Sequence, residues 1–473
     1  MAVAAPAFVI GLAVVVLAWR LGSSSLFVDE VYSWLAGNAS PGQLFHLVRI
    51  NEVAPPTYYL MLHGWIKLFD SDSEAVMRSL SLIAAVGAVA ATYWIGNLLA
   101  GRLIAVLAAA LLAVSPLLLE YGQEVRSYAW AMFAVTVAVG AALQSQQSTS
   151  KRGRWLTLAA TASVFAIWIH YSAALIVGVL TAYIAIDRTC PVSLRRRFVI
   201  GVGVGTALVL PFAVAQYEHG TTNAIAPYAK LTFYNLKRVI GAPFDRTYPV
   251  LSSATTVLGA LVVIAGVAAL WLPGAAKRVR HPRLLFCLAA GPALALLVLT
   301  IVGKSVLISR YDAIAVPFVA LSIASTVAIV RWIGIVVWAA ALAIAIPANL
   351  TAHDTLHEYP NTRAAVQFVA SSWRRNDVLI VGTAFGGSEL QYYAERYLPK
   401  NASIGYSAGF APLFYLLTHP HYKISRLAMI TQTLGSRSEL AARFASRHWH
   451  LTSEREFTGT VPFQALTASR DPG

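Results

Sequence analysis

Residues 79–119 read SLSLIAAVGAVAATYWIGNLLAGRLIAVLAAALLAVSPLLL, two long apolar runs separated by Gly101 and Arg102. A bilayer core needs about 20 apolar residues per helix, so the stretch predicts two consecutive transmembrane helices. The whole chain of 473 residues has the same character, with 58% apolar and 12% charged residues and a mean hydropathy of +0.63. Soluble domains carry about 25% charged residues. The composition excludes a soluble enzyme and a disordered chain, and two cysteines exclude a disulfide scaffold.

Nine further apolar runs flank this stretch. They cover residues 2–19, 128–143, 155–169, 172–186, 198–216, 251–272, 284–302, 311–330 and 332–350. The first run lacks a basic start, and its first cation, Arg20, follows it, so it reads as an uncleaved span rather than a signal peptide. His170 marks a break between two runs. Together the runs predict an all-α polytopic membrane protein with about eleven transmembrane helices.

The charges predict the orientation. With the N-terminus inside, thirteen Lys and Arg residues fall in the short cytoplasmic segments beside one acid, Asp187. Dense basic loops face the cytoplasm, so the net charge of +15 needs no nucleic-acid partner. Eleven of the twelve acids before residue 350 lie on the outer side or at its boundary. We therefore expect the chemistry on the outer, extracytoplasmic side.

The chain after the last run changes character. Residues 351–473 hold no spanning run, and an odd number of spans places them outside. The pattern predicts helices over 362–375, 388–397 and 438–447 and a buried strand over 377–382. The sequence thus predicts a transmembrane catalytic domain over residues 1–350 and a small extracytoplasmic α/β domain over residues 351–473.

A pair of carboxylates follows the first span directly, in Phe27-Val28-Asp29-Glu30. Carboxylates at the mouth of a membrane helix are costly unless they are solvated, paired or used. The chain continues through a long amphipathic outer loop that contains Pro55-Pro56-Thr57-Tyr58-Tyr59, His63 and Trp65. A solvated acidic loop with an aromatic belt at the interface is the alternative interpretation.

Two more charged clusters are predicted at the outer boundary. The first contains Glu120, Glu124 and Arg126, between the third and fourth spans. The alternative interpretation is a structural turn in which Arg126 offsets the repulsion between the two acids. The second contains Lys304 with Arg310, followed by Tyr311 and Asp312. Two cations at this depth can bind an anionic headgroup, whereas snorkelling to bulk lipid phosphates is the alternative.

These features together resemble the GT-C glycosyltransferases, in the branch of protein O-mannosyltransferases and aminoarabinose transferases. The resemblance rests on the Asp-Glu pair after span one, the Pro-Pro-x-Tyr-Tyr-x-x-x-His-x-Trp run, the Glu-x-Arg-x-Tyr of residues 124–128 and the late Arg-Tyr. It covers roughly residues 1–330 in order and spacing.

The resemblance implies an inverting transfer of a sugar, a hexose such as mannose or a pentose, from a polyprenyl-phosphate donor to an acceptor hydroxyl. Asp29 would be the general base, and Glu30 would orient the acceptor or the loop. The implied donor-phosphate ligands are Arg126, Lys304, Arg310 and Tyr311. The implied supporting or acceptor-side residues are Glu120 or Glu124, Tyr58, Tyr59, His63 and His170, although a hydrogen-bonded structural role is an alternative for His170. The lipid phosphate already activates the sugar, so no cofactor is expected, and no metal site is implied.

The resemblance also implies the partners and the location: a glycan, lipid or protein acceptor, the lipid bilayer and the plasma (inner) membrane of a bacterium. The main alternative is a transporter or flippase of lipid-linked sugars. Transporters place charges near the midplane and show repeated halves. Here the charges gather at the outer boundary, and no repeat is visible. A non-catalytic scaffold is a third interpretation.

Overall fold

The computed structural model divides the chain into two compact units. The first contains residues 1–21 and 33–352, and the second contains residues 22–32 and 353–473. The sequence predicted that residues 22–32 belong to the transmembrane domain, because the predicted boundary lies after residue 350. The structure instead groups residues 22–32 with the C-terminal unit. The structure describes residues 4–219, 229–244, 253–358, 361–375, 377–382, 388–406, 426–432, 442, 444–445, 449–457 and 463–470.

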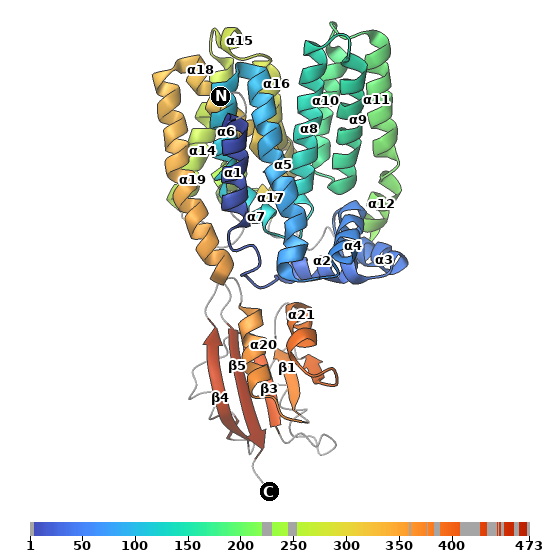
Figure 1. Cartoon of the computed structure of the whole chain (residues 1–473), viewed down its shortest axis with the longest axis vertical. Helices are drawn as coiled ribbons and strands as arrows, with labels where there is room; N and C mark the ends of the chain where they lie inside the picture. The colour runs from blue at the N-terminus through green and yellow to red at the C-terminus, as the bar shows by residue number, and fades with distance from the viewer. Residues whose placement is uncertain are drawn as a thin grey trace. The chain divides into compact units, whose positions relative to one another are not determined.

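The first unit is a bundle of long helices (Figure 1). Its main helices are α1 (Ala4–Ala18), α5 (Glu74–Ala100), α6 (Arg102–Ala113), α7 (Pro116–Gly122), α8 (Tyr128–Gln147), α9 (Arg152–Ile169), α10 (Ala173–Ile186), α11 (Val192–Ala207), α12 (Leu210–Glu218), α14 (Ser253–Ala268), α16 (Pro282–Ile301), α18 (Val316–Val330) and α19 (Trp332–Glu358). Its short ones are α13 (Phe233–Ile240), α15 (Ala275–Arg278), α17 (Ser309–Asp312), η2 (Ala242–Phe244), η3 (Ala269–Trp271) and η4 (Ala313–Ala315).

A helix overlaps each of the eleven predicted runs, but fewer of them qualify as spans. Within the described residues, seven helices are long and apolar enough to cross a membrane, and eight if α6 and α7 form one bent span. Two more apolar helices, α1 and α10, are shorter. The number eleven therefore stays a prediction. The 63° bend between α6 and α7 falls at Ser115-Pro116, because proline cannot donate the helical hydrogen bond and Ser115 begins a new helix.

Small residues let these helices approach closely. A Cβ on Gly96 of α5 would lie 2.6 Å from the backbone of Ala105 in α6. A Cβ on Gly140 of α8 would lie 2.6 Å from the indole of Trp94 in α5. Glycine is needed at both places because membrane helices associate through close packing rather than hydrophobic burial.

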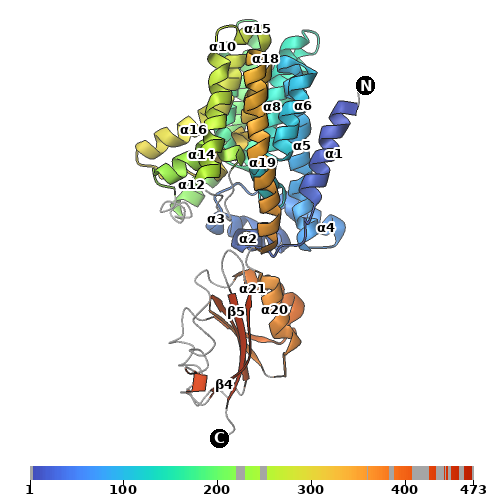
Figure 2. The same cartoon turned by 90° about the vertical axis from the view of Figure 1, so that its left-hand side faces the viewer.

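The predicted amphipathic outer loop is a group of three helices, α2 (Val28–Asn38), α3 (Pro41–Asn51) and α4 (Thr57–Phe69). Figures 1 and 2 show α2 and α3 running crosswise to the long helices, at the end of the bundle where α12 also lies. Pro55 and Pro56 lie between α3 and α4, because the residue before a proline is disfavoured in the helical conformation. Trp34 Nε1 donates a hydrogen bond of 2.7 Å to the Asp72 carboxylate, which fixes α2 beside the start of α5.

The second unit is built on a five-stranded sheet with the order β2-β1-β3-β5-β4. Its elements are α20 (Thr362–Ser371), β1 (Val378–Gly382), α21 (Ser388–Tyr397), β2 (Ser403–Tyr406), β3 (Arg426–Gln432), β4 (Trp449–Phe457) and β5 (Phe463–Arg470). Strand β1 pairs in parallel with β2 and β3, while β5 pairs antiparallel with β3 and β4. Figure 2 shows α20 and α21 on one side of this sheet.

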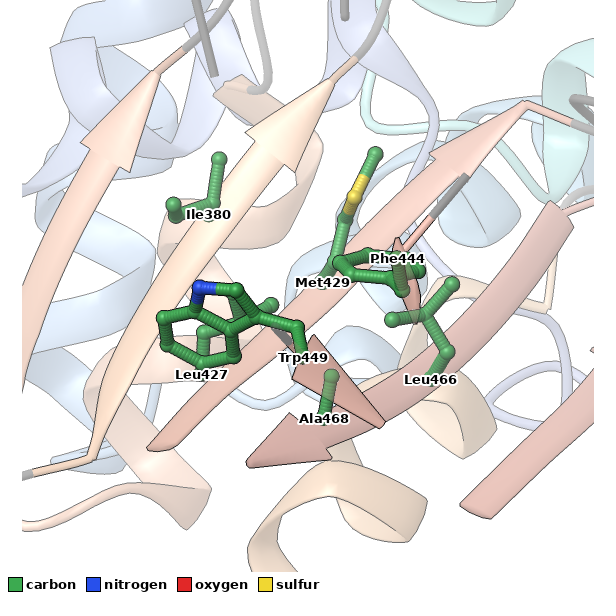
Figure 3. Close-up of a cluster of buried hydrophobic side chains, with 7 residues drawn as sticks. All are labelled: Ile380, Leu427, Met429, Phe444, Trp449, Leu466 and Ala468. Carbon is green, nitrogen blue, oxygen red and sulfur yellow. The ribbon is translucent and has the colours of Figure 1, made fainter. Parts of the chain in front are cut away.

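The structure confirms the predicted strand and the helix over 388–397, and it ends the first predicted helix at Ser371. The predicted helix over 438–447 lies largely outside the described residues. The alternation of a strand places Leu427 and Met429 on one face of β3, where they pack with Trp449 and Phe444 (Figure 3). Each side chain of this cluster is at most 3% exposed. The C-terminal unit therefore has a hydrophobic core of its own.

Candidate functional site

The two carboxylates after α1 lie in different environments. Helix α2 begins at Val28, so Asp29 and Glu30 are in its first turn, where the free N–H groups favour negative charge. Glu30 Oε2 accepts a hydrogen bond of 3.3 Å from the N–H of Phe27, as the third residue of a capping box does. Glu30 is buried, whereas Asp29 is partly exposed. Glu30 thus stabilises the start of the helix, and Asp29 presents an accessible carboxylate.

In the first unit, the centre of the candidate site is a buried ion pair. Arg126 Nη1 lies 2.7 Å from Glu52 Oε1, and the two residues are 8% and 4% exposed. Removing two charges from water is costly unless they are closely paired. Glu52 was not among the predicted site residues. Its position as a lone carboxylate just before Ala54-Pro55-Pro56 was the signal that could have identified it.

Helix α4 places two tyrosines beside this pair. The Tyr58 hydroxyl lies 3.1 Å from Ser81 Oγ, and Ser81 donates a hydrogen bond to the carbonyl of Arg126. Burial raises the pKa of Tyr59, and the Glu52 carboxylate raises it further. Both tyrosines are fully buried. The structure thus brings the predicted residues Tyr58, Tyr59 and Arg126 together around Glu52.

Gln216 of α12 fixes the backbone that carries Glu52. Its Nε2 lies 2.8–3.0 Å from the carbonyl oxygens of Val48, Glu52 and Ala54. Its Oε1 accepts a hydrogen bond of 2.8 Å from the Tyr171 hydroxyl. Since Gln216 is distant in sequence from these partners, its role was not visible before the structure.

An aromatic cluster surrounds His170, which lies between α9 and α10 as the sequence predicts. The imidazole is 4.8 Å from the Tyr128 ring and 6.2 Å from the Tyr311 ring, measured between centroids. The Tyr121 ring lies 4.5 Å from that of Tyr128. His170 Nδ1 lies 2.8 Å from Ser172 Oγ. The cluster therefore joins residues from α7, α8, α17 and the α9–α10 link.

The two predicted cations Arg126 and Arg310 both act on His170. Burial, together with the positive charges of Arg126 and Arg310, lowers the pKa of His170 to about 3. The imidazole is therefore neutral at pH 7. The Tyr121 hydroxyl lies within range of the charges of Glu120, Glu124 and Arg310. The structure thus places Arg126, Arg310, His170 and Tyr311 in one neighbourhood.

We expect His170 to make the protein less stable in acid. An unfolded histidine binds a proton near pH 6.5 and the folded one near pH 3, so between these values the unfolded state holds more protons and stability falls as pH falls. The slope from one such group is at most about 1.4 kcal/mol per pH unit. The thermal midpoint in detergent should therefore drop less between pH 7 and pH 5 in His170→Gln than in wild type. An equal drop in both proteins would contradict this.

Other predicted residues lie elsewhere. Lys304 is exposed. His63 Nδ1 donates a hydrogen bond of 2.8 Å to the carbonyl of Gly37, which joins α4 to α2. Glu120 is buried within α7, which ends at Gly122, so Glu124 lies beyond the helix and the two acids do not share a helical face. Residues 123–127, which include Glu124, form the non-helical link from α7 to α8.

No protein-family model matches the chain, and no curated protein matches its sequence. Solved structures do match it. ArnT from Cupriavidus metallidurans, bound to undecaprenyl phosphate, aligns over 97% of both chains with a TM-score of 0.59 and 13% identity. The oligosaccharyltransferase AglB from Archaeoglobus fulgidus, in complex with an inhibitory peptide and a dolichol-phosphate, aligns over 90% of this chain and 69% of its own with a TM-score of 0.52 and 12% identity. The chain therefore has the fold of the GT-C glycosyltransferases, the family that its sequence motifs resemble.

Proposed function

We propose that the protein is a membrane glycosyltransferase that moves a sugar from a polyprenyl phosphate to an acceptor hydroxyl. The observation that carries the proposal is the similarity to ArnT, which extends over 97% of both chains and includes a structure with undecaprenyl phosphate bound. The order of the Asp-Glu pair, the Glu-x-Arg-x-Tyr run and the late Arg-Tyr along this chain supports it.

The proposed reaction is a single inverting displacement. The acceptor hydroxyl oxygen attacks C1 of the sugar, Asp29 takes the hydroxyl proton, and the bond from C1 to the phosphate oxygen breaks. The polyprenyl phosphate leaves with that electron pair. A general base must be within hydrogen-bond reach of the proton it takes, and Asp29 is the partly exposed member of its pair. Glu30, which accepts a hydrogen bond from the N–H of Phe27 at the start of α2, orients the acceptor or the loop in this scheme.

The leaving phosphate gains charge and needs fixed positive groups. Among the predicted cations, Arg310 is our first choice as its ligand, with Tyr311 beside it. The charge of Arg126 is already compensated by Glu52, so we assign Arg126 a supporting role. Lys304 is exposed, which suits a contact at the edge of the headgroup. The Tyr121 hydroxyl is buried and has no hydrogen-bond partner among the described residues. This favours a polar ligand, such as the donor phosphate, beside Tyr121.

We further propose that the sugar is a hexose such as mannose, or a pentose, and that the acceptor is a glycan, a lipid or a protein. The side of the membrane follows from the basic loops, which favour an extracytoplasmic reaction in the plasma membrane of a bacterium. Glu120 and Glu124 are proposed to support the site, and Tyr58, Tyr59, His63 and His170 to shape its acceptor side.

Reconstituted protein tests this proposal. Proteoliposomes would receive undecaprenyl-phosphate sugars with radiolabelled mannose, galactose or arabinose, together with extracts of cell-envelope glycans and lipids. We expect label to move covalently from the lipid to an acceptor for one sugar of the panel. Label that crosses the bilayer while it remains on the polyprenyl lipid would instead support a flippase and would refute the transferase.

Replacing Arg310 with alanine should weaken donor binding. Hydrogen bonds between charged groups contribute about 1.5–3 kcal/mol, so we expect undecaprenyl phosphate to bind about 10- to 100-fold more weakly in detergent. Arg331→Ala is the matched control, because Arg331 is an exposed arginine at the opposite end of the same candidate span, Ser309–Val330. Equal affinity in both variants would leave snorkelling to bulk lipid as the better account of Arg310.

A further inference from the structure

The segment that precedes Asp29 is held by one arginine of the C-terminal unit. Arg363 Nη2 donates hydrogen bonds to the carbonyls of Gly22 and Ser24, at 3.0 and 3.3 Å, and Nη1 donates to that of Ser23, at 3.4 Å. Three successive carbonyls are thus bound by the planar fork of a single guanidinium. A lysine ammonium lacks this fork and cannot reproduce the arrangement.

The next two residues are held as well. Ser25 Oγ accepts a hydrogen bond of 3.1 Å from the backbone N–H of Arg363, which lies in the first turn of α20 and has no acceptor within its own helix. The N–H of Leu26 donates to the Tyr393 hydroxyl at 2.7 Å. Each residue from Gly22 to Leu26 therefore makes a hydrogen bond to α20 or α21.

Arg363 and Tyr393, the two residues that hold the segment 22–26, are themselves tightly packed. The Arg363 guanidinium lies 5.9 Å from the centre of the Tyr393 ring. Tyr393 is fully buried, packs edge-on against Tyr392 at 4.8 Å and stacks on Tyr397 at 6.4 Å. Ser24, Ser25 and Leu26 are at most 5% exposed. Because its hydrogen-bond partners are fixed and its own residues are buried, the segment 22–26 has little conformational freedom.

The held segment leads directly into the proposed base. Phe27 follows Leu26, its N–H is bound by Glu30, and α2 begins at Val28. The geometry points to a new role for the C-terminal domain: it positions the start of α2, so Arg363 and Tyr393 are positioning residues for Asp29 in sugar transfer. This inference rests on the proposed function. A base displaced by about 1 Å can cost up to about 100-fold in rate.

Two single variants of the full chain test this role. Arg363→Lys keeps the charge but loses the fork, and Tyr393→Phe removes only the hydroxyl that holds Leu26. Their matched controls are Arg455→Lys, at an exposed site on β4, and Tyr397→Phe, on the same helix as Tyr393. With the labelled undecaprenyl-phosphate sugar that transfers in the panel above, we expect both test variants to lower kcat about tenfold or more. We expect their donor KM to stay within about twofold, and the controls to match wild type.

Hydrogen exchange of peptides that cover residues 22–30 supplies a readout independent of activity. Exchange should accelerate in Arg363→Lys and Tyr393→Phe and stay unchanged in the controls. Wild-type exchange in both test variants, or faster exchange with wild-type kcat while Asp29→Asn is inactive, would overturn the positioning role alone. If Asp29→Asn transfers sugar normally, the proposed function fails and the positioning role fails with it.

Discussion

Replacing Asp29 with asparagine is expected to lower kcat for sugar transfer about 10²- to 10⁴-fold, the usual contribution of a general base. The asparagine side chain has nearly the same shape, so the first turn of α2 should still form. The donor should still bind, because its phosphate is proposed to bind elsewhere, at Arg310. The measurement is single-turnover transfer from the labelled donor, with donor affinity and the thermal midpoint determined on the same preparation.

Asp70→Asn is the matched control for this experiment. Asp70 is an exposed carboxylate at the C-terminal end of α4, in a left-handed conformation (φ +48°) that asparagine tolerates. The same chemical change there should leave transfer intact. Turnover at the wild-type rate in Asp29→Asn would remove the assignment of the base and, with it, the proposed mechanism.

Glu52→Gln is expected to cause the largest loss of stability. It leaves the buried guanidinium of Arg126 without the carboxylate that lies 2.7 Å away. Breaking a buried ion pair by removing one partner costs about 3–5 kcal/mol. The free energy of unfolding, measured by denaturant titration in mixed micelles, should fall by that order, and the lipid and detergent must be held fixed for the comparison.

A double-mutant cycle separates this pair from other effects. Arg126→Met alone should also destabilise the protein, but Glu52→Gln combined with Arg126→Met should recover part of the loss, because no unpaired charge remains. Strictly additive losses, or a Glu52→Gln variant as stable as wild type, would show that the two side chains do not depend on each other.

These experiments distinguish two kinds of residue at the candidate site. Asp29 and Arg310 are proposed to contact substrate, so their variants should change rate or donor affinity more than stability. Glu52, Gln216 and His170 fix the surrounding backbone and charges, so their variants should change stability first. The pH dependence expected for His170 belongs to the second kind, since its imidazole is neutral and adds no charge to the site.

The sequence alone was sufficient for the positions of the membrane helices and, in the C-terminal domain, for two helices and one of the five strands. Apolar runs predicted where helices lie, because a membrane helix satisfies its own backbone and needs only the right length of apolar side chains. The break at His170 and the strand over 377–382 were predicted equally well, since both depend on residues close in the chain. The number of spans was less certain, because α1, α9 and α10 are short or only moderately apolar.

Only the tertiary structure could identify the partners of the individual polar groups. The pairs Glu52–Arg126, Gln216–Glu52 and Arg363–Gly22 join residues 74, 164 and 341 positions apart. No local pattern specifies such contacts, because a buried charge or carbonyl can be satisfied by any suitable group that the fold brings within about 3 Å. The sequence therefore predicted which residues could do the chemistry. Folding decided which of them are structural, and it assigned the segment before Asp29 to the C-terminal unit through hydrogen bonds made far along the chain.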